Sequence, residues 1–181
     1  MEQNYTITKS NVECYKLRHQ SGIYWADITI DSRETTGRIQ IASDFGSWQN
    51  YWGACGKSFK EFLTTLDMHY FAGKVGATGW FDLNKTIVQY KEYVLSERRK
   101  EFIEADSARK MFDEIKSLFE ITTSEFYNHM SNECPILMEH FDYCPDTVTD
   151  VTPEFRKFWE MVWGVFVNVL KEEMSVSSKK I

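Results

Sequence analysis

The hydrophobic period of the chain changes near residue 57, and this change constrains the fold more than any single motif. Before it, three segments alternate in part between apolar and polar residues and are rich in β-branched and aromatic side chains: VECYKLR (12–18), IYWADITI (23–30) and GRIQIASD (37–44). A period of two is typical of strands with one buried face, and turn-forming residues separate the segments. The first third therefore predicts an antiparallel meander, with Tyr5–Lys9 as a further edge strand.

After residue 57 the apolar spacing becomes helical. Ser58 with Glu61, and Thr122 with Glu125, match the capping box, which satisfies free amides at a helix N-terminus. From Lys85 onward, apolar residues recur at the three- and four-residue intervals of an amphipathic helix. The second part of the chain is therefore expected to be helical.

Two further segments complete the helical part. Asp67 can cap a short helix that runs through Lys74. The segment ECPILMEHFDYCPDTVTDVTP (133–153) contains several prolines and acids, so we expect an irregular acidic connection there.

The last helix is predicted most clearly. Thr152 is its cap and Pro153 lies in its first turn. Glu160, Gly164 and Asn168 then form one narrow polar stripe, and most other residues are apolar. A helix that is apolar almost all round is buried centrally or covers a partner, so a homodimer through this helix is one expectation, with Gly164 allowing close approach.

These patterns predict an α+β fold, in which an N-terminal antiparallel β-meander packs against a C-terminal set of α-helices. The length of 181 residues fits a single domain over 1–181, with a β-rich part at 1–56 and a helical part at 57–181. No apolar run is long enough to span a bilayer, and the polar start MEQNYTITKS does not resemble a secretory signal. We therefore expect a cytoplasmic protein without a membrane partner.

Negative charge is concentrated in the second half of the chain. Residues 1–90 hold nine basic and nine acidic side chains, whereas residues 91–181 hold twelve and eighteen. Between residues 120 and 160, only Arg156 and Lys157 oppose nine carboxylates: Glu120, Glu125, Glu133, Glu139, Asp142, Asp146, Asp150, Glu154 and Glu160. Such a region repels phosphate backbones and attracts basic protein surfaces.

The Asp-Phe-Gly tripeptide at residues 44–46 does not indicate a kinase. A kinase also needs a glycine-rich loop, a strand lysine and a His-Arg-Asp loop, and none is present. The aromatics that follow, Trp48, Tyr51 and Trp52, either pack the sheet against the first helix or form an exposed binding hot spot. Packing is the favoured interpretation.

No sequence motif supports catalysis. Cys134, His140 and Cys144 are close in sequence, but their spacing matches no common zinc module, and whether they bind a metal stays open. There is no phosphate-binding loop and no nucleophile elbow. We therefore expect a protein that is not an enzyme and needs no cofactor.

Four segments carry a resemblance to a class of proteins: IASDFGSWQNYWGACG (41–56), SFKEFLTTLDMHYFAGKV (58–75), RRKEF (98–102) and SARKMFDEI (107–115). This pattern resembles small accessory proteins of phages and mobile elements. In size and character the chain is similar to anti-CRISPR proteins of the Cas9-inhibiting type. The resemblance implies an inhibitory binding protein in a bacterial host cell that engages a CRISPR effector, with or without its guide RNA or DNA.

Two sets of residues are candidates for this binding. The charged surface would consist of Glu133, Glu139, Asp142, Asp146 and Asp150, and the second-line anchors would be Trp48, Tyr51 and Trp52. An ordinary solvated loop explains the acidic residues equally well. A metal-dependent hydrolase, or another small phage enzyme, is the alternative function, and direct contact with nucleic acid is disfavoured by the net charge of −6.

Overall fold

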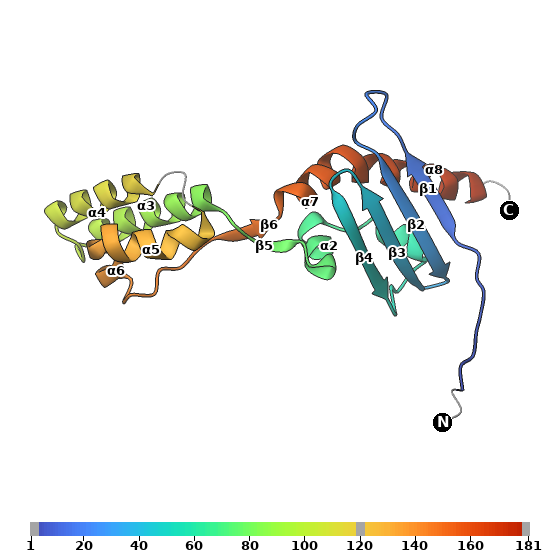
Figure 1. Cartoon of the computed structure of the whole chain (residues 1–181), viewed down its shortest axis with the longest axis horizontal. Coiled ribbons are helices and arrows are strands. Elements are labelled where there is room, and N and C mark those ends of the chain that lie inside the picture. The colour runs from blue at the N-terminus through green and yellow to red at the C-terminus, as the bar shows by residue number, and fades with distance from the viewer. Residues whose placement is uncertain (1–3, 119–121, 179–181) are drawn as a thin grey trace. The chain divides into compact units, whose positions relative to one another are not determined.

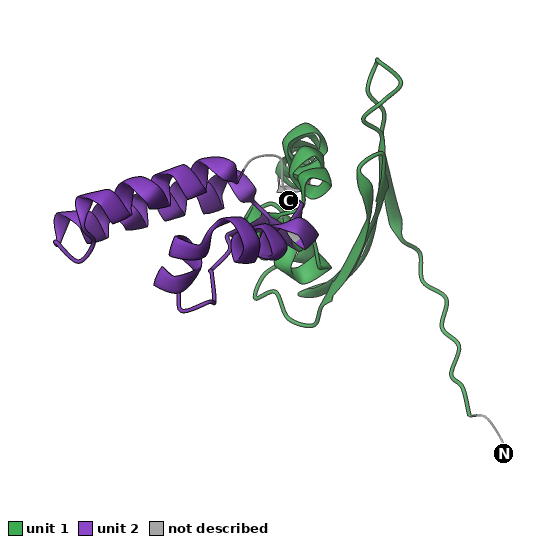
Figure 2. Cartoon of the chain, turned by 60° about the vertical axis from the view of Figure 1, so that its left-hand side comes forward, with its two compact units in different colours: residues 1–78, 151–181 green, residues 79–150 purple. Residues whose placement is uncertain are grey.

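The computed structural model describes residues 4–118 and 122–178. The chain divides into two compact units, residues 1–78 with 151–181 (unit 1) and residues 79–150 (unit 2), which Figure 2 shows in different colours. No linker in the sequence marks this division. The single domain over 1–181 stays a prediction.

Unit 1 contains a four-stranded antiparallel sheet with the strand order β1-β2-β3-β4 (Figure 1). The strands are β1 (Glu13–Leu17), β2 (Ala26–Arg33), β3 (Thr36–Ser43) and β4 (Gly46–Trp52). This confirms the predicted α+β fold with an N-terminal meander. The edge strand predicted at Tyr5–Lys9 is wrong, because the β1 ladder begins only at Glu13, which pairs with Ile30 of β2.

Helices cover one face of this sheet and leave the other face open (Figure 2). They are α1 (Phe59–Leu63), α2 (Met68–Val75), α7 (Pro153–Phe158), the π-helical turn η1 (Trp159–Trp163) and α8 (Gly164–Ser178). The covered face is apolar in the middle of β2 and β3, where Ile28 and Ile39 are completely buried. Against it packs an aromatic core, in which Phe71 lies 4.9 Å from Trp163 between ring centres.

The sequence signals for the helix starts in unit 1 are confirmed. The Ser58 side chain accepts a hydrogen bond from the Glu61 amide at α1, and Asp67 accepts one from Tyr70 at α2. Thr152 caps α7 in the same way.

Unit 2 is built around a separate helical core. Its elements are β5 (Thr78–Phe81), α3 (Leu83–Arg99), α4 (Ala105–Ser117), α5 (Thr123–Glu133), α6 (Pro135–His140) and β6 (Thr149–Val151). β5 and β6 pair as a two-stranded sheet, so the chain enters and leaves unit 2 through neighbouring strands. Tyr90, Met111 and Phe126 are almost completely buried in this core. The capping box at Thr122 is confirmed at α5.

The irregular connection predicted at 133–153 is wrong, because this segment contains α6 and β6. Pro135 occupies the first turn of α6, where its missing amide hydrogen is not needed. The next two amides, of Ile136 and Leu137, donate to the Glu114 carboxylate of α4 at 3.1 and 2.8 Å. A cap supplied from another helix leaves no signal in the local sequence.

No helix in the described ranges is long and apolar enough to cross a membrane.

Candidate functional site

The excess negative charge of the chain belongs to unit 2. Residues 79–150 hold eight Lys or Arg and fifteen Asp or Glu, a formal charge of −7, whereas the rest of the chain holds thirteen and twelve, a formal charge of +1. The structure therefore separates a nearly neutral unit from a strongly acidic one. Long-range attraction to cationic surfaces comes from unit 2.

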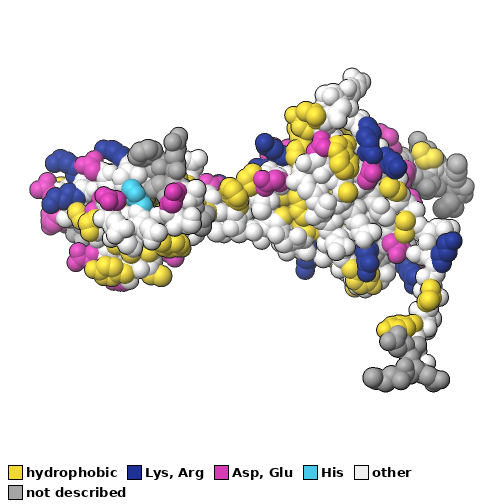
Figure 3. Space-filling view, in the orientation of Figure 1, with side chains coloured by type: hydrophobic (Ala, Val, Ile, Leu, Met, Phe, Trp, Pro, Cys, Tyr) yellow, Lys and Arg dark blue, Asp and Glu magenta, His cyan; other side chains and the backbone are white. Residues whose placement is uncertain are grey.

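Within unit 2 the charges are separated again. Residues 117–150 contain no lysine or arginine. On the visible face of unit 2 in Figure 3, the dark blue cationic side chains lie over the α4 side. The segment that forms α5, α6 and the following turn thus contains Asp and Glu residues but no lysine or arginine.

Four of the five predicted carboxylates are exposed. Glu133, Glu139, Asp142 and Asp146 lie on the surface, and no ion pair found among the described residues involves them. The fifth, Asp150, is only 7% exposed at its side chain and pairs with Lys85 of α3. Glu120, which the charge count included, lies outside the described residues.

Three of the exposed carboxylates lie at the end of α6 or in the turn that follows it, and we call Glu139, Asp142 and Asp146 the acidic turn. The Asp142 amide donates to the Glu139 carbonyl oxygen at 3.2 Å. The Tyr90 hydroxyl of α3 donates to the Asp146 carbonyl oxygen at 2.8 Å. The turn is therefore held against Tyr90, a buried residue of α3.

Phe141 fixes the middle of the acidic turn on α3. Its ring lies 4.7 Å from the ring of Tyr90 and 5.3 Å from that of Tyr93, between centres. Burial raises the pKa of the Tyr93 hydroxyl. The negative charges of Glu97 and Asp142 act in the same direction, and the positive charge of Lys100 opposes them.

An exposed aromatic ring lies inside the acidic turn, and the sequence analysis missed it. Tyr143 is 73% exposed. Asp142 and Tyr143 both have left-handed backbones, with φ of 50° and 60°, and the Tyr143 amide donates to the Met138 carbonyl oxygen at 2.8 Å. This geometry ends α6 without a glycine and leaves the Tyr143 ring in solvent. The sequence feature that could have identified Tyr143 is an aromatic residue between two acids, Asp142 and Asp146, in a segment without lysine or arginine.

Glu133 lies in a different place, in a hollow of about 600 Å³ that also contains Lys110, Ser117 and His129. The Ser117 hydroxyl oxygen is 2.9 Å from Nε2 of His129. However, the same hydroxyl can donate to the Glu114 carbonyl oxygen, 2.7 Å away within its own helix. A hydrogen bond from a serine hydroxyl to a carbonyl in the preceding turn is common in helices.

The three residues considered for zinc are not gathered. Cys134 is completely buried, and burial raises the pKa of its thiol, while Cys144 is exposed on the turn. Across the described part of the chain, no group of three or more His, Cys, Asp and Glu side chains is placed to hold a metal ion.

The three aromatic candidates of unit 1 separate into two kinds. Trp52 is buried, and Trp48 packs edge-on against Phe155 with ring centres 5.0 Å apart. These two support the packing interpretation. Tyr51 alone projects from the open face of the sheet, where it is 58% exposed.

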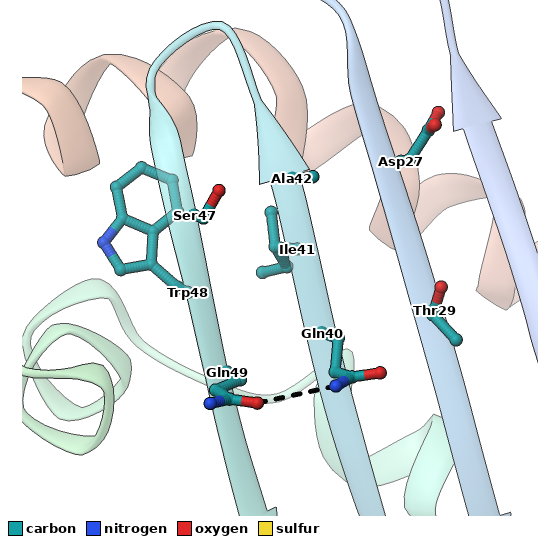
Figure 4. Close-up of a pocket in the computed structure, with 8 residues that line it drawn as sticks. All are labelled: Asp27, Thr29, Gln40, Ile41, Ala42, Ser47, Trp48 and Gln49. Carbon is teal, nitrogen blue, oxygen red and sulfur yellow. Dashed lines mark hydrogen bonds between the residues drawn. The ribbon is translucent and has the colours of Figure 1, made fainter.

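The open sheet face also carries a shallow depression of about 360 Å³ (Figure 4). Asp27, Thr29, Gln40 and Gln49 border it from neighbouring strands, and the Gln40 side-chain amide donates to Oε1 of Gln49 at 3.5 Å. Asp27 is paired with Arg18 at 2.6 Å. The depression therefore offers hydrogen bonds but no pair of titratable groups for acid–base chemistry.

The comparisons with known proteins gave one result. A model described as a phage family, Phage_phiTE_072, matches residues 5–172. The searches of curated proteins and of solved structures returned no match.

Proposed function

Because the chain belongs to this phage family, we propose that it is a phage binding protein that inhibits a host effector by occupying one of its surfaces. The acidic turn of unit 2 is the contact, and the target is a cationic groove that normally holds nucleic acid. The protein performs no chemistry of its own in this proposal. A Cas9-type CRISPR nuclease is the specific target that we propose.

One observation carries the proposal: the exposed carboxylates of the acidic turn lie in a segment that contains no lysine or arginine. Charges that are not neutralised within their own molecule attract an oppositely charged partner over about one Debye length, which is roughly 8 Å at physiological salt. A Cas9-type effector holds its guide and target in positively charged channels. The two surfaces are therefore complementary in sign.

The exposed ring of Tyr143 gives this surface an anchor. Tyrosine is enriched at binding hot spots because it buries a large area with few rotatable bonds and keeps a polar tip. Around it, the charges of Glu139, Asp142 and Asp146 steer the approach and fix the orientation. A surface of this kind combines an apolar contact with a charged rim.

The test uses purified full-length protein and Cas9 loaded with guide RNA. We expect inhibition of DNA cleavage at near-equal molar amounts, with binding that weakens as salt is raised. Neutralising the acidic turn with Glu139→Gln, Asp142→Asn and Asp146→Asn should weaken binding at least about tenfold. Tyr143→Ala should weaken it without changing its salt dependence.

A matched control separates the acidic turn from net charge. Glu92→Gln, Asp106→Asn and Asp113→Asn remove the same charge from exposed positions on α3 and α4 and should leave binding nearly unchanged. If both triple variants bind equally, the acidic turn is not the contact. If the unmodified protein does not bind guide-loaded Cas9 at low salt, the assignment of Cas9 fails. A shift of free DNA or RNA by the protein would replace the proposal with direct nucleic-acid binding.

A further inference from the structure

The last helix presents apolar side chains to solvent. Met161, Val165 and Val169 are 46%, 55% and 37% exposed, and they follow one another at four-residue intervals. Polar and charged residues flank them on the same exposed side. We call the whole surface the helix face, and it consists of Lys157, Glu160, Met161, Gly164, Val165, Asn168, Val169, Lys171 and Glu172.

The charges of the helix face are arranged symmetrically around Val165. Lys157 lies eight residues before Val165, and Glu172 lies seven residues after it. Glu160 lies five residues before Val165, and Lys171 lies six residues after it, so both pairs match to within one residue and carry opposite charges. None of the ion pairs found in the described ranges uses any of these four side chains.

From this arrangement we propose that two copies of the chain pair through the helix face, with the helices antiparallel and the two-fold axis beside Val165. In a two-fold contact, a residue before the axis meets the residue equally far behind it on the other copy. Lys157 then meets the partner's Glu172, and Glu160 meets the partner's Lys171. Met161 meets the partner's Val169, and Val165 meets the partner's Val165.

Gly164 supports this contact independently. Its φ is −60°, which every residue type adopts, and a Cβ atom built on it would meet nothing within 4 Å. The fold of a single copy therefore gives no reason for a glycine in the middle of this helix, where glycine is unfavourable. A helix that crosses close to Val165 supplies the reason, because the missing side chain lets two backbones approach.

The balance of charge favours a second copy over other occupants. The helix face holds two lysines and two glutamates, so it has no net attraction for an anionic membrane surface or for nucleic acid. A parallel pair of helices would place like charges opposite each other, whereas the antiparallel pair matches every charge. This pairing involves only unit 1 and does not depend on the acidic turn.

The decisive experiment is disulfide trapping in the full chain. The background is Cys14→Ser with Cys144→Ser, since both native thiols are exposed. We expect Val165→Cys to form a covalent dimer under mild oxidation. Val176→Cys is the matched control, because Val176 is also 55% exposed in the same helix but faces no copy of itself in this register.

A mixture of two single variants fixes the direction of the helices. Met161→Cys chains mixed with Val169→Cys chains should cross-link to each other, and neither should cross-link efficiently alone. Equal trapping of Val165→Cys and Val176→Cys would overturn the proposal.

Charge exchange gives a second and independent readout. Lys157→Glu alone and Glu172→Lys alone should each weaken self-association several-fold in light scattering, and the double variant should restore it. Both positions are exposed, and circular dichroism checks that the variants stay folded. Unmodified protein that scatters as a monomer at tens of micromolar would also overturn the proposal.

Discussion

The hydroxyl group of Tyr15 in β1 donates a hydrogen bond of 2.9 Å to the Glu173 carboxylate in α8. Lys60 of α1 joins this pair, since its ammonium group donates to Glu173 at 3.0 Å and to Glu13 at 2.6 Å. One small network thus connects the edge strand of the sheet, the first helix and the last helix of unit 1. Burial raises the pKa of Tyr15 to about 12. The Glu173 and Glu13 carboxylates act in the same direction, whereas the Lys60 ammonium group, which donates to the hydroxyl oxygen, lowers this pKa.

Replacing Tyr15 should produce a stability difference that depends on pH. Tyr15→Phe should lower the free energy of unfolding by about 1 kcal/mol at pH 8, because the hydrogen bond that the hydroxyl donates to a carboxylate is lost. A raised pKa in the folded state means that the contribution of Tyr15 is complete below the unfolded pKa of about 10 and disappears as pH rises toward 12. Urea unfolding of both proteins at pH 8 and pH 11 measures the difference in the free energy of unfolding. A difference that is the same at both pH values would contradict this role of Tyr15.

The packing of α1 on β3 should not tolerate a side chain at Gly37. A Cβ atom there would overlap the ring of Phe59, which is almost completely buried. Gly37→Ala should therefore lower the free energy of unfolding by about 2–3 kcal/mol, since a packed core resists added volume. Gly53→Ala is the control, because its Cβ would make an ordinary 3.8 Å contact with Tyr51. Similar melting temperatures for the two variants would show that α1 lies elsewhere.

At Gly164 the same substitution should have two opposite effects. Gly164→Ala should raise the stability of the isolated chain by about 1 kcal/mol, because alanine is the better helix former. It should also weaken self-association, since the added methyl group lies beside the proposed two-fold axis. Thermal unfolding at low concentration and light scattering at high concentration measure the two effects. An unchanged association constant would count against close helix approach.

The remote cap of α6 should be essential to unit 2. Glu114→Gln replaces a carboxylate that accepts two backbone amides with a group that accepts through one oxygen only. We expect a loss of about 1–2 kcal/mol in the unfolding of unit 2. Asp113→Asn, at the exposed neighbouring position, should cost much less. Amide hydrogen exchange of residues 135–140 would locate the effect, and equal protection in both variants would contradict it.

The separate core of unit 2 predicts that residues 79–150 fold on their own. Every residue of that core lies between residues 81 and 141, and the two ends of the unit meet where β5 pairs with β6. The excised segment should be helical and should unfold cooperatively in urea. A broad transition without cooperativity would show that the core needs unit 1.

Sequence patterns predicted the fold wherever its cause is local. Four helix starts were predicted from a capping residue in the local sequence, and each of these caps is present in the structure: Ser58, Asp67, Thr122 and Thr152. The meander of β1 to β3 was predicted because its inward and outward residues alternate. β4 was missed, since aromatic residues occupy both of its faces and hide the alternation.

The rest of the structure depends on contacts between distant residues. The helix α6 depends on Glu114, and the burial of Asp150 depends on Lys85, which is far away in sequence. The candidate site shows the same limit. Composition identified its acids, but only the left-handed backbone at residues 142 and 143 places an exposed tyrosine among them.

The insertion of unit 2 between the two parts of unit 1 has a consequence for synthesis on the ribosome. The four strands of the sheet, with α1 and α2, emerge first, then all of unit 2, and last the helices that carry Phe155, Phe158 and Phe166. The nascent chain therefore completes its second body before its first. A product terminated early, before residue 155, would carry a finished unit 2 attached to a sheet with much of its apolar face uncovered, which is a substrate for chaperones and proteases.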